Sequence, residues 1–310
     1  MKTTLVTAYT NPDLDGLACV YGYAEYLIKT GRQVIAGIIG KPHVEAEYIL
    51  ERFKIPKPQS ILNSDGYDQI ILVDVSNLDG LNGSIEPDKV IEIIDHRKVN
   101  EVHKFLNAKL QIEFVGAAAT LIAEKYIQDN IEISKESAIL IYSAIISNTL
   151  NFKGTVTTDR DRRAAEWVNQ TAQLSESFWK ELFLAKSDLS GLKLKQRIHF
   201  AGFVMGNKKV SIAQIEMIGA RKLVKERGLE IIQIINDLAG KVNSDLIFLN
   251  IIELEEEKNY FVVTNDITKK VLEKVLNINF VGNIGEKSGL ILRKQIVPLL
   301  KDELEQNNQI

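Results

Sequence analysis

Several side chains in the first hundred residues could together bind a metal ion. Asp13 and Asp15 stand two residues apart in "NPDLDG", Asp74 ends "IILVD", and Asp95 precedes His96 in "IIDHR". Carboxylates that face each other repel, and a divalent cation relieves that repulsion. Aspartate oxygens with one imidazole nitrogen suit manganese or magnesium better than zinc or copper, and the imidazole favours manganese. The residue types therefore indicate a divalent-metal site.

The elements around these residues must bring them together. Mostly apolar runs predict strands within 3–8, 33–39, 68–76 and 89–96, and helical apolar spacing predicts helices within 16–30 and 43–53. Such alternation predicts a doubly wound α/β domain with a parallel sheet covered on both faces, which binds ligands at the carboxyl ends of its strands. The aspartates fall at those ends. Because side chains alternate along an extended segment, we expect Asp13 and Asp15 to point the same way.

Each of these residues also has an ordinary structural explanation, which the pattern alone leaves open. Asp13 in "NPD" fits a helix N-cap or a turn, and Asp74 could simply begin a loop. His96 could be a hydrogen-bonded structural histidine. A helix that begins near Gly16 would favour a bound anion such as phosphate at its N-terminus.

The second half of the chain predicts a different domain. Helices are expected within 115–128, 134–152 and 158–173, followed by a polar, Lys- and Arg-rich linker. A hairpin around "GNKK", a helix at 219–240, strands within 245–253 and 260–265, a helix at 267–276 and a last strand within 289–297 then indicate a smaller mixed α/β domain. We therefore predict a domain at 1–187, a linker at 188–197 and a second domain at 198–310.

Composition limits the function classes. The 310 residues have a formal net charge of −3, which argues against a general nucleic-acid binder but allows a local anion site. The single cysteine, Cys19, excludes an internal disulfide framework and suits a reducing compartment. We see no signal peptide and no apolar run near the roughly 20 residues that span a bilayer. We expect a cytoplasmic protein with no membrane partner, and a homodimer is an open alternative.

The ordered motifs "NPDLDG", "LVDVSN", "IDHRK", "VGAAATLIAEKY" and "SAIISNTLNFKGTVTTDRD" resemble the DHH phosphoesterase family. Together with the C-terminal "LILRKQIVPLL", they resemble most the two-domain manganese-dependent inorganic pyrophosphatases, whose second domain is of the DHHA2 type. The resemblance covers nearly the whole chain.

The resemblance implies roles for particular residues. Asp13, Asp15, Asp74 and His96 match ligands of a metal pair, and Asp74 matches the catalytic aspartate that bridges both metals. A water deprotonated by the metals would attack phosphorus. Basic residues of the second domain would close over the substrate in an interdomain cleft.

The sequence departs from the family pattern at its metal ligands. Tyr9 stands where the family has a histidine ligand, so this ligand position has departed from the family pattern. Asn148 replaces an aspartate ligand, although its carbonyl oxygen could still bind metal. The family balances two divalent ions with the charges of four aspartates, whereas three remain here, because Asn148 is neutral. Tyr9 adds no charge, since a tyrosine is normally protonated. We therefore predict one well-held metal at Asp15, Asp74 and His96, and a second, weak one near Asp13 and Tyr9.

The substrate-binding positions differ as well. Arg97 replaces the second histidine, giving a "DHR" that resembles the prune branch, and it would bind phosphate as a two-pronged donor in a catalytic role. An expected lysine falls on Ala201, with Lys195 or Arg197 as alternatives. In the C-terminal motif, Arg293 and Lys294 are the predicted substrate-binding residues.

These expectations define the predicted function. We predict a metal-dependent phosphohydrolase that cleaves a phosphoanhydride, such as pyrophosphate or polyphosphate, or a small phosphate ester. Mn²⁺ is the expected cofactor, with Mg²⁺ and Co²⁺ as alternatives. The main alternative is a phosphate-binding or regulatory homologue with weakened catalysis. A further one is nucleotide or oligonucleotide hydrolysis.

Overall fold

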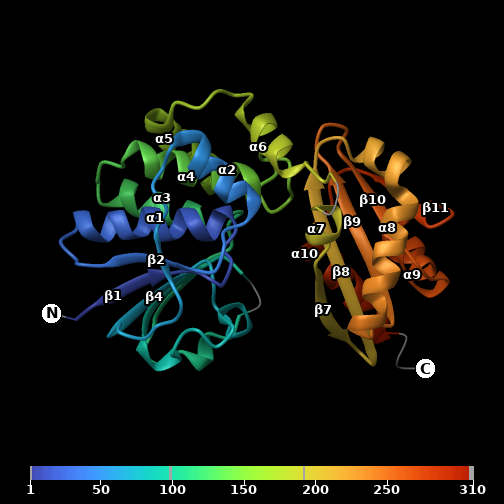
Figure 1. Cartoon of the computed structure of the whole chain (residues 1–310), viewed down its shortest axis with the longest axis horizontal. Helices are drawn as coiled ribbons and strands as arrows, with labels where there is room; N and C mark the ends of the chain where they lie inside the picture. Colours follow the sequence, from blue (N-terminus) through green and yellow to red (C-terminus); the bar gives the residue numbers. More distant parts are fainter. Residues whose placement is uncertain (1, 98–99, 191–192, 307–310) are drawn as a thin grey trace. The chain divides into compact units, whose positions relative to one another are not determined.

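The structure is a computed structural model that describes residues 2–97, 100–190 and 193–306. It consists of two units, Met1–Ala185 and Lys186–Ile310, each with its own sheet (Figure 1). The predicted α/β fold, with a parallel sheet in the first domain and a mixed sheet in the second, is confirmed. In the described part of the chain, no helix is long and apolar enough to cross a membrane.

The first unit is built on a six-stranded parallel sheet with the order β3-β2-β1-β4-β5-β6. Its apolar central strands match the predicted ones, whereas the two edge strands were not predicted. The edge strands are short and largely exposed, so their sequences lack an apolar run. The strands are β1 (Thr4–Thr7), β2 (Ile35–Ile39), β3 (Gln59–Ile61), β4 (Gln69–Val73), β5 (Val90–Asp95) and β6 (Lys109–Ile112).

Helices cover one face of this sheet. Figure 1 shows α1, α3, α4 and α5 grouped on the same side of β1, β2 and β4. On the other face, Leu5 and Leu72 of the sheet pack against Leu81 and Phe105 from the connecting segments. These segments contain the short 3₁₀ turns η1 (Asp79–Leu81), η2 (Pro87–Lys89) and η3 (Val102–Lys104). The helices are α1 (Leu14–Lys29), α2 (Val44–Phe53), α3 (Ala118–Gln128), α4 (Lys135–Asn148), α5 (Asp159–Ala172) and α6 (Phe178–Lys186).

The strand order creates a switch point between β1 and β4. From β1 the chain runs outward to β2 and β3, and it then returns to β4 and continues outward to β5 and β6. The loops that follow the two adjacent strands at such a point run in opposite directions, so a ligand-binding crevice forms between them. The segment with Asp13 and Asp15 follows β1, and Asp74 follows β4 directly, so both approach this point.

The second unit has a mixed sheet that is buried on both faces, with the order β11-β12-β10-β9-β8-β7. Among the described strands of this sheet, only β8 and β9 pair in parallel. Alternate residues of β8 face opposite cores: Ile215 packs with α8, and Ile212 packs with α9 and α10. The elements are α7 (Lys193–Arg197), β7 (Phe200–Met205), β8 (Lys208–Met217), α8 (Ala220–Val242), β9 (Leu246–Glu253), β10 (Lys258–Val263), α9 (Asp266–Leu276), β11 (Asn279–Val281), β12 (Ile284–Ser288) and α10 (Arg293–Gln306).

The predicted last strand within 289–297 is wrong. From Arg293 the chain forms helix α10, because Ile296, Leu300 and Leu304 recur every four residues and bury one helical face. The hairpin β11–β12 just before it was also missed. Within the predicted linker, 188–197, residues 193–197 are helical, and residues 191–192 lie outside the described part of the chain.

Candidate metal centre

Asp15 lies in the first turn of α1 and is fully buried. Its carboxylate accepts hydrogen bonds from the backbone N–H groups of Ala118 and Ala119, each at 2.8 Å. These groups begin α3, whose own N-cap residue provides no side-chain cap. The carboxylate therefore caps a second helix, where the positive end of the helix dipole stabilises its charge.

The start of α3 is itself held by a buried carboxylate that the sequence analysis did not single out. Asp161 of α5 accepts hydrogen bonds from the Gly116 N–H, at 2.9 Å and 3.0 Å, and from the Thr120 hydroxyl at 2.6 Å. It also completes a capping box with Thr158. The "TDRD" pattern signals this cap but not the contact with Gly116, which is distant in sequence. Asp161 therefore positions the N–H groups that orient Asp15.

Asp74 follows β4 in the left-handed region, with φ = 54°, and is 1% exposed. Neither of its carboxylate oxygens has a hydrogen-bond partner among the described residues. Arg97 lies beside it, with Nη2 at 3.2 Å from Oδ1, but without hydrogen-bond geometry. Buried polar atoms without partners are rare in native proteins and call for an explanation such as a bound ion.

His96 directly follows β5, and its ring is fixed by the backbone. Nδ1 lies 2.9 Å from the Val115 carbonyl oxygen. A carbonyl can only accept, so Nδ1 carries a proton, which leaves the lone pair of the neutral ring on Nε2. Nε2 lies 3.5 Å from Oδ1 of Asp74 and 3.8 Å from Oδ2 of Asp15. This is the arrangement in which metal-binding histidines are oriented by a backbone carbonyl.

Three predicted ligands thus converge. One atom each from Asp15, Asp74 and His96 lie within 4.8 Å of one another, and the two carboxyl groups are buried. Burial raises the pKa of both carboxyl groups above the ordinary value, most strongly for Asp74. Two carboxylate oxygens and one imidazole nitrogen, with the Asp74 carboxylate accepting no hydrogen bond from the described residues, fit a divalent ion such as Mn²⁺.

Asp13 has a different immediate role. Its Oδ1 accepts hydrogen bonds from the N–H groups of Asp15 at 2.9 Å and Gly16 at 3.0 Å, so Asp13 is the N-cap of α1. The segment from Asp13 to Asp15 is not extended, contrary to the expectation, because α1 begins at Leu14. As a metal ligand, Asp13 stays a prediction.

The two replaced ligand positions make hydrogen bonds around the same aspartates. The Tyr9 hydroxyl accepts from the Asp13 N–H at 3.0 Å, and burial, with Asp13 and Asp74 nearby, raises the pKa of Tyr9 so that it stays neutral. The Asn148 amide nitrogen donates to Oδ2 of Asp15 at 2.6 Å. An aspartate at position 148 would instead repel Asp15 unless a cation lay between them. Asn148 as a ligand stays a prediction.

Arg97 points at the aspartates of the site. Besides its contact with Asp74, its Nη1 donates to the Asp74 carbonyl oxygen and lies 3.4 Å from both carboxylate oxygens of Asp95. Asp95 is fully buried and also accepts from the Ser76 hydroxyl and from the His96 N–H at 2.7 Å. The sequence placed Asp95 at this strand end without giving it a role. The structure shows it as the anchor of Arg97.

The predicted substrate-binding residues Arg293 and Lys294 belong to the second unit. Arg293 is the first residue of α10; its N–H donates to the Gln214 side chain, and its guanidinium donates to the Ile212 carbonyl oxygen at 3.3 Å. Lys294 is exposed. Ala201 lies in β7. Substrate binding by Arg293 and Lys294 stays a prediction.

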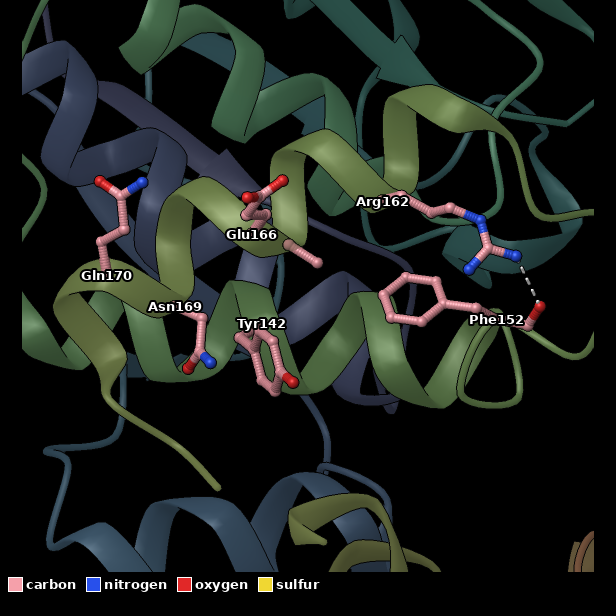
Figure 2. A pocket seen from close by; sticks show the side chains of 7 residues that line it. Tyr142, Phe152, Arg162, Glu166, Asn169 and Gln170 are labelled. Carbon is pink, nitrogen blue, oxygen red and sulfur yellow. Dashed lines mark hydrogen bonds between the residues drawn. The ribbon is translucent and has the colours of Figure 1, made fainter. Parts of the chain in front are cut away.

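A separate hollow of about 420 Å³ lies along α4 and α5 and includes none of the predicted site residues (Figure 2). The Arg162 guanidinium lies over the Phe152 ring, 5.0 Å from its centroid, and donates to the Phe152 carbonyl oxygen at 3.1 Å. Glu166 is the one acidic residue of its lining, so this hollow lacks a carboxylate cluster for a metal. Its lining is Tyr142, Phe152, Arg162, Ala165, Glu166, Asn169 and Gln170.

Comparison with known proteins identifies the family of this chain. Residues 3–145 match the model of the DHH family, N-terminal domain, and residues 180–303 match that of the DHHA2 domain. The manganese-dependent inorganic pyrophosphatase of Bacillus subtilis (strain 168) is 30% identical over 98% of this chain and 99% of its own. The chain belongs to the DHH family. The predicted family resemblance is thereby confirmed.

This DHH-family protein also resembles solved structures. A candidate family II inorganic pyrophosphatase of Methanococcus jannaschii shares 31% identity and a TM-score of 0.78, over 97% of this chain and 99% of its own. An exopolyphosphatase-related protein of Bacteroides fragilis shares 14% identity and a TM-score of 0.50, over 99% of this chain and 93% of its own, which shows a common fold.

Proposed function

We propose that this DHH-family protein is a metal-dependent phosphohydrolase that cleaves phosphoanhydrides, with Mn²⁺ as its preferred ion. The observation that carries the proposal is the convergence of Asp15, Asp74 and His96, in which the buried Asp74 carboxylate accepts no hydrogen bond from the described residues. The proposal is supported by the similarity to the Bacillus subtilis protein, which is named a manganese-dependent inorganic pyrophosphatase.

The residues of the site have different proposed roles. Asp15, fixed on α3, and His96, fixed on the Val115 carbonyl, would hold the ion together with Asp74. A bound divalent ion supplies a water of lowered pKa as nucleophile and stabilises charge on the phosphate oxygens. Arg97 stays protonated and can donate to a phosphate oxygen, but it cannot act as an acid.

Phosphate release from pyrophosphate, tripolyphosphate and a small phosphate ester, each with Mn²⁺, Mg²⁺ and Co²⁺, tests the proposal. We expect release from an anhydride with Mn²⁺, and its loss in Asp74→Asn. Asp79→Asn, which alters an exposed carboxylate on η1, should keep the rate. No release from any substrate would contradict the proposal.

One observation favours a second candidate, a phosphate-binding or regulatory protein with weakened catalysis. Neutral, hydrogen-bonded Tyr9 and Asn148 stand where the family resemblance implies metal ligands. No phosphate release in that assay, together with phosphate binding in a separate binding measurement, would select this alternative. A homodimer, the absence of nucleic-acid binding and a cytoplasmic location stay predictions.

A further inference from the structure

The carboxylate of Asp74 lies between two groups of partners. His96 Nε2 lies 3.5 Å from Oδ1 of Asp74, and one ligand atom each of Asp15, Asp74 and His96 lie within 4.8 Å of one another. Beside the same Oδ1 lies the Arg97 guanidinium, with Nη2 at 3.2 Å. Oδ1 is therefore shared between the three-residue metal group and a fixed positive charge.

The guanidinium of Arg97 is held in place by several contacts. Nη1 donates to the Asp74 carbonyl oxygen and lies 3.4 Å from both oxygens of Asp95. The guanidinium carbon lies 5.5 Å from the centroid of the Tyr9 ring, within cation–π range. An arginine with two carboxylates, a carbonyl and an aromatic ring around it is built into the site, although 37% of its side chain is exposed.

Arg97 thus lies where a second ion would need its ligands. A second ion on this side would draw on Asp74, Asp13 and position 9. Position 9 is a tyrosine whose hydroxyl already accepts from the Asp13 N–H, and whose ring supports the guanidinium. A divalent ion there would stand next to a permanent positive charge, and the repulsion between them is strong in a buried setting.

We propose that Arg97 is the built-in second cation of this site, so the protein holds a single divalent ion at Asp15, Asp74 and His96. The guanidinium balances the carboxylate of Asp74 on the side of Tyr9 and opposes uptake of a second ion. The inference rests on the proposed metal centre, but not on turnover.

The test is a count of bound Mn²⁺ in the full chain, loaded with Mn²⁺ alone and passed through a desalting column. We expect about one ion per chain, with the EPR spectrum of an isolated Mn²⁺. Tyr9→His should stay at about one, because the guanidinium remains, whereas Tyr9→His/Arg97→Gln should rise to about two with a spin-coupled spectrum. Tyr9→His/Arg97→Lys, which keeps the charge, should stay at one.

The matched control is Tyr9→His/Arg32→Gln. Arg32 is similarly exposed, at 41%, and pairs with Glu92 at 3.5 Å, so its loss should leave the count at one. Two coupled ions in the wild type would overturn the proposal. So would a second ion in Tyr9→His alone, or a single ion in a folded Tyr9→His/Arg97→Gln, with folding checked by circular dichroism.

The count also separates this inference from the proposed function. One bound ion in Tyr9→His and two in Tyr9→His/Arg97→Gln, without phosphate release from the wild type, would support the role of Arg97 and contradict the hydrolase. Two bound ions with phosphate release would do the reverse. If Arg97→Gln prevents folding, the count and spectrum of Tyr9→His still decide, because the histidine ligand is then restored beside an intact Arg97. A single ion supports the proposal, and a coupled pair contradicts it.

Discussion

Nε2 of His96 lies 3.5 Å from Oδ1 of Asp74, and Nδ1 of the same ring is bound to the Val115 carbonyl oxygen. The backbone thus fixes which nitrogen faces the aspartate before any ligand arrives. Asp74 contributes a buried carboxylate with no hydrogen bond of its own among the described residues. This pair, completed by Asp15, is the preorganised part of the site.

Replacing Asp74 should abolish stabilisation by metal. In the wild type, Mn²⁺ at about 100 times its Kd should stabilise the fold by roughly 2.7 kcal/mol. Asp74→Asn should lose most of that gain in stability, because a neutral amide replaces the charged carboxylate that would bind the ion together with Asp15 and His96. Thermal unfolding with and without Mn²⁺ measures it. Asp79→Asn should retain the full gain, and an equal gain in Asp74→Asn would place the ion elsewhere.

Asn148→Asp should strengthen metal binding while weakening the metal-free fold. The substitution removes the 2.6 Å donor to Asp15 and sets two carboxylates against each other. The loss of a buried hydrogen bond and the added repulsion should cost the metal-free protein about 1–3 kcal/mol. A bound ion should recover that cost, so the difference between unfolding with and without Mn²⁺ should grow.

Asn63→Asp is the matched control for that experiment. Asn63 donates to Asp65 at 2.9 Å in the same way, but both residues are exposed. Its replacement should change stability by less than about 0.5 kcal/mol and leave the response to Mn²⁺ unchanged. A smaller response to Mn²⁺ in Asn148→Asp than in the wild type would contradict the assigned contact.

Gly116→Ala should disturb the support of Asp15. A Cβ at this position would lie 2.5 Å from Cγ2 of Thr149 and 3.0 Å from Oδ2 of Asp161, so the start of α3 must shift. We expect a loss of about 1–3 kcal/mol in the free energy of unfolding and weaker Mn²⁺ binding. Denaturant unfolding and Mn²⁺ titration measure both. Gly202→Ala, where a Cβ meets nothing within 4 Å, should change neither.

The pH dependence of stability should include a contribution from Glu25, which joins α1 to the start of α4. Burial alone would raise the pKa of Glu25, but Lys29 and hydrogen bonds from Ser134 and Ser137 outweigh it and lower the pKa. A lowered carboxylate pKa stabilises the fold above the unfolded value of about 4.5, and this gain is lost as pH falls through the folded pKa.

Glu25→Gln should therefore cost about 1–2 kcal/mol at pH 7, from the lost charged hydrogen bonds. The difference from the wild type should shrink as the pH falls below about 4.5. Urea unfolding across this range measures it. A difference that is constant with pH would show that the ionised form of Glu25 does not provide this stability.

The sequence predicts the convergence of the site because apolar runs locate the buried strands and the aspartates follow them. It does not reveal β3 and β6, since edge strands need no apolar run, and it misplaces a strand at α10, where short apolar runs fit both periods. Nor does it reveal that Asp15 caps α3 or that Asp161 holds Gly116. Those contacts join residues 103 and 45 positions apart, and only the fold brings them together.

The most direct test of the central claim is phosphate release from pyrophosphate and tripolyphosphate, followed as Mn²⁺ is added to the metal-free protein. The account predicts no release without metal, and a rate that rises in proportion to the ion bound at Asp15, Asp74 and His96. His96→Gln should require far more Mn²⁺, whereas His103→Gln, in η3, should match the wild type. Release that does not depend on metal, or that is unchanged in His96→Gln, would contradict the account.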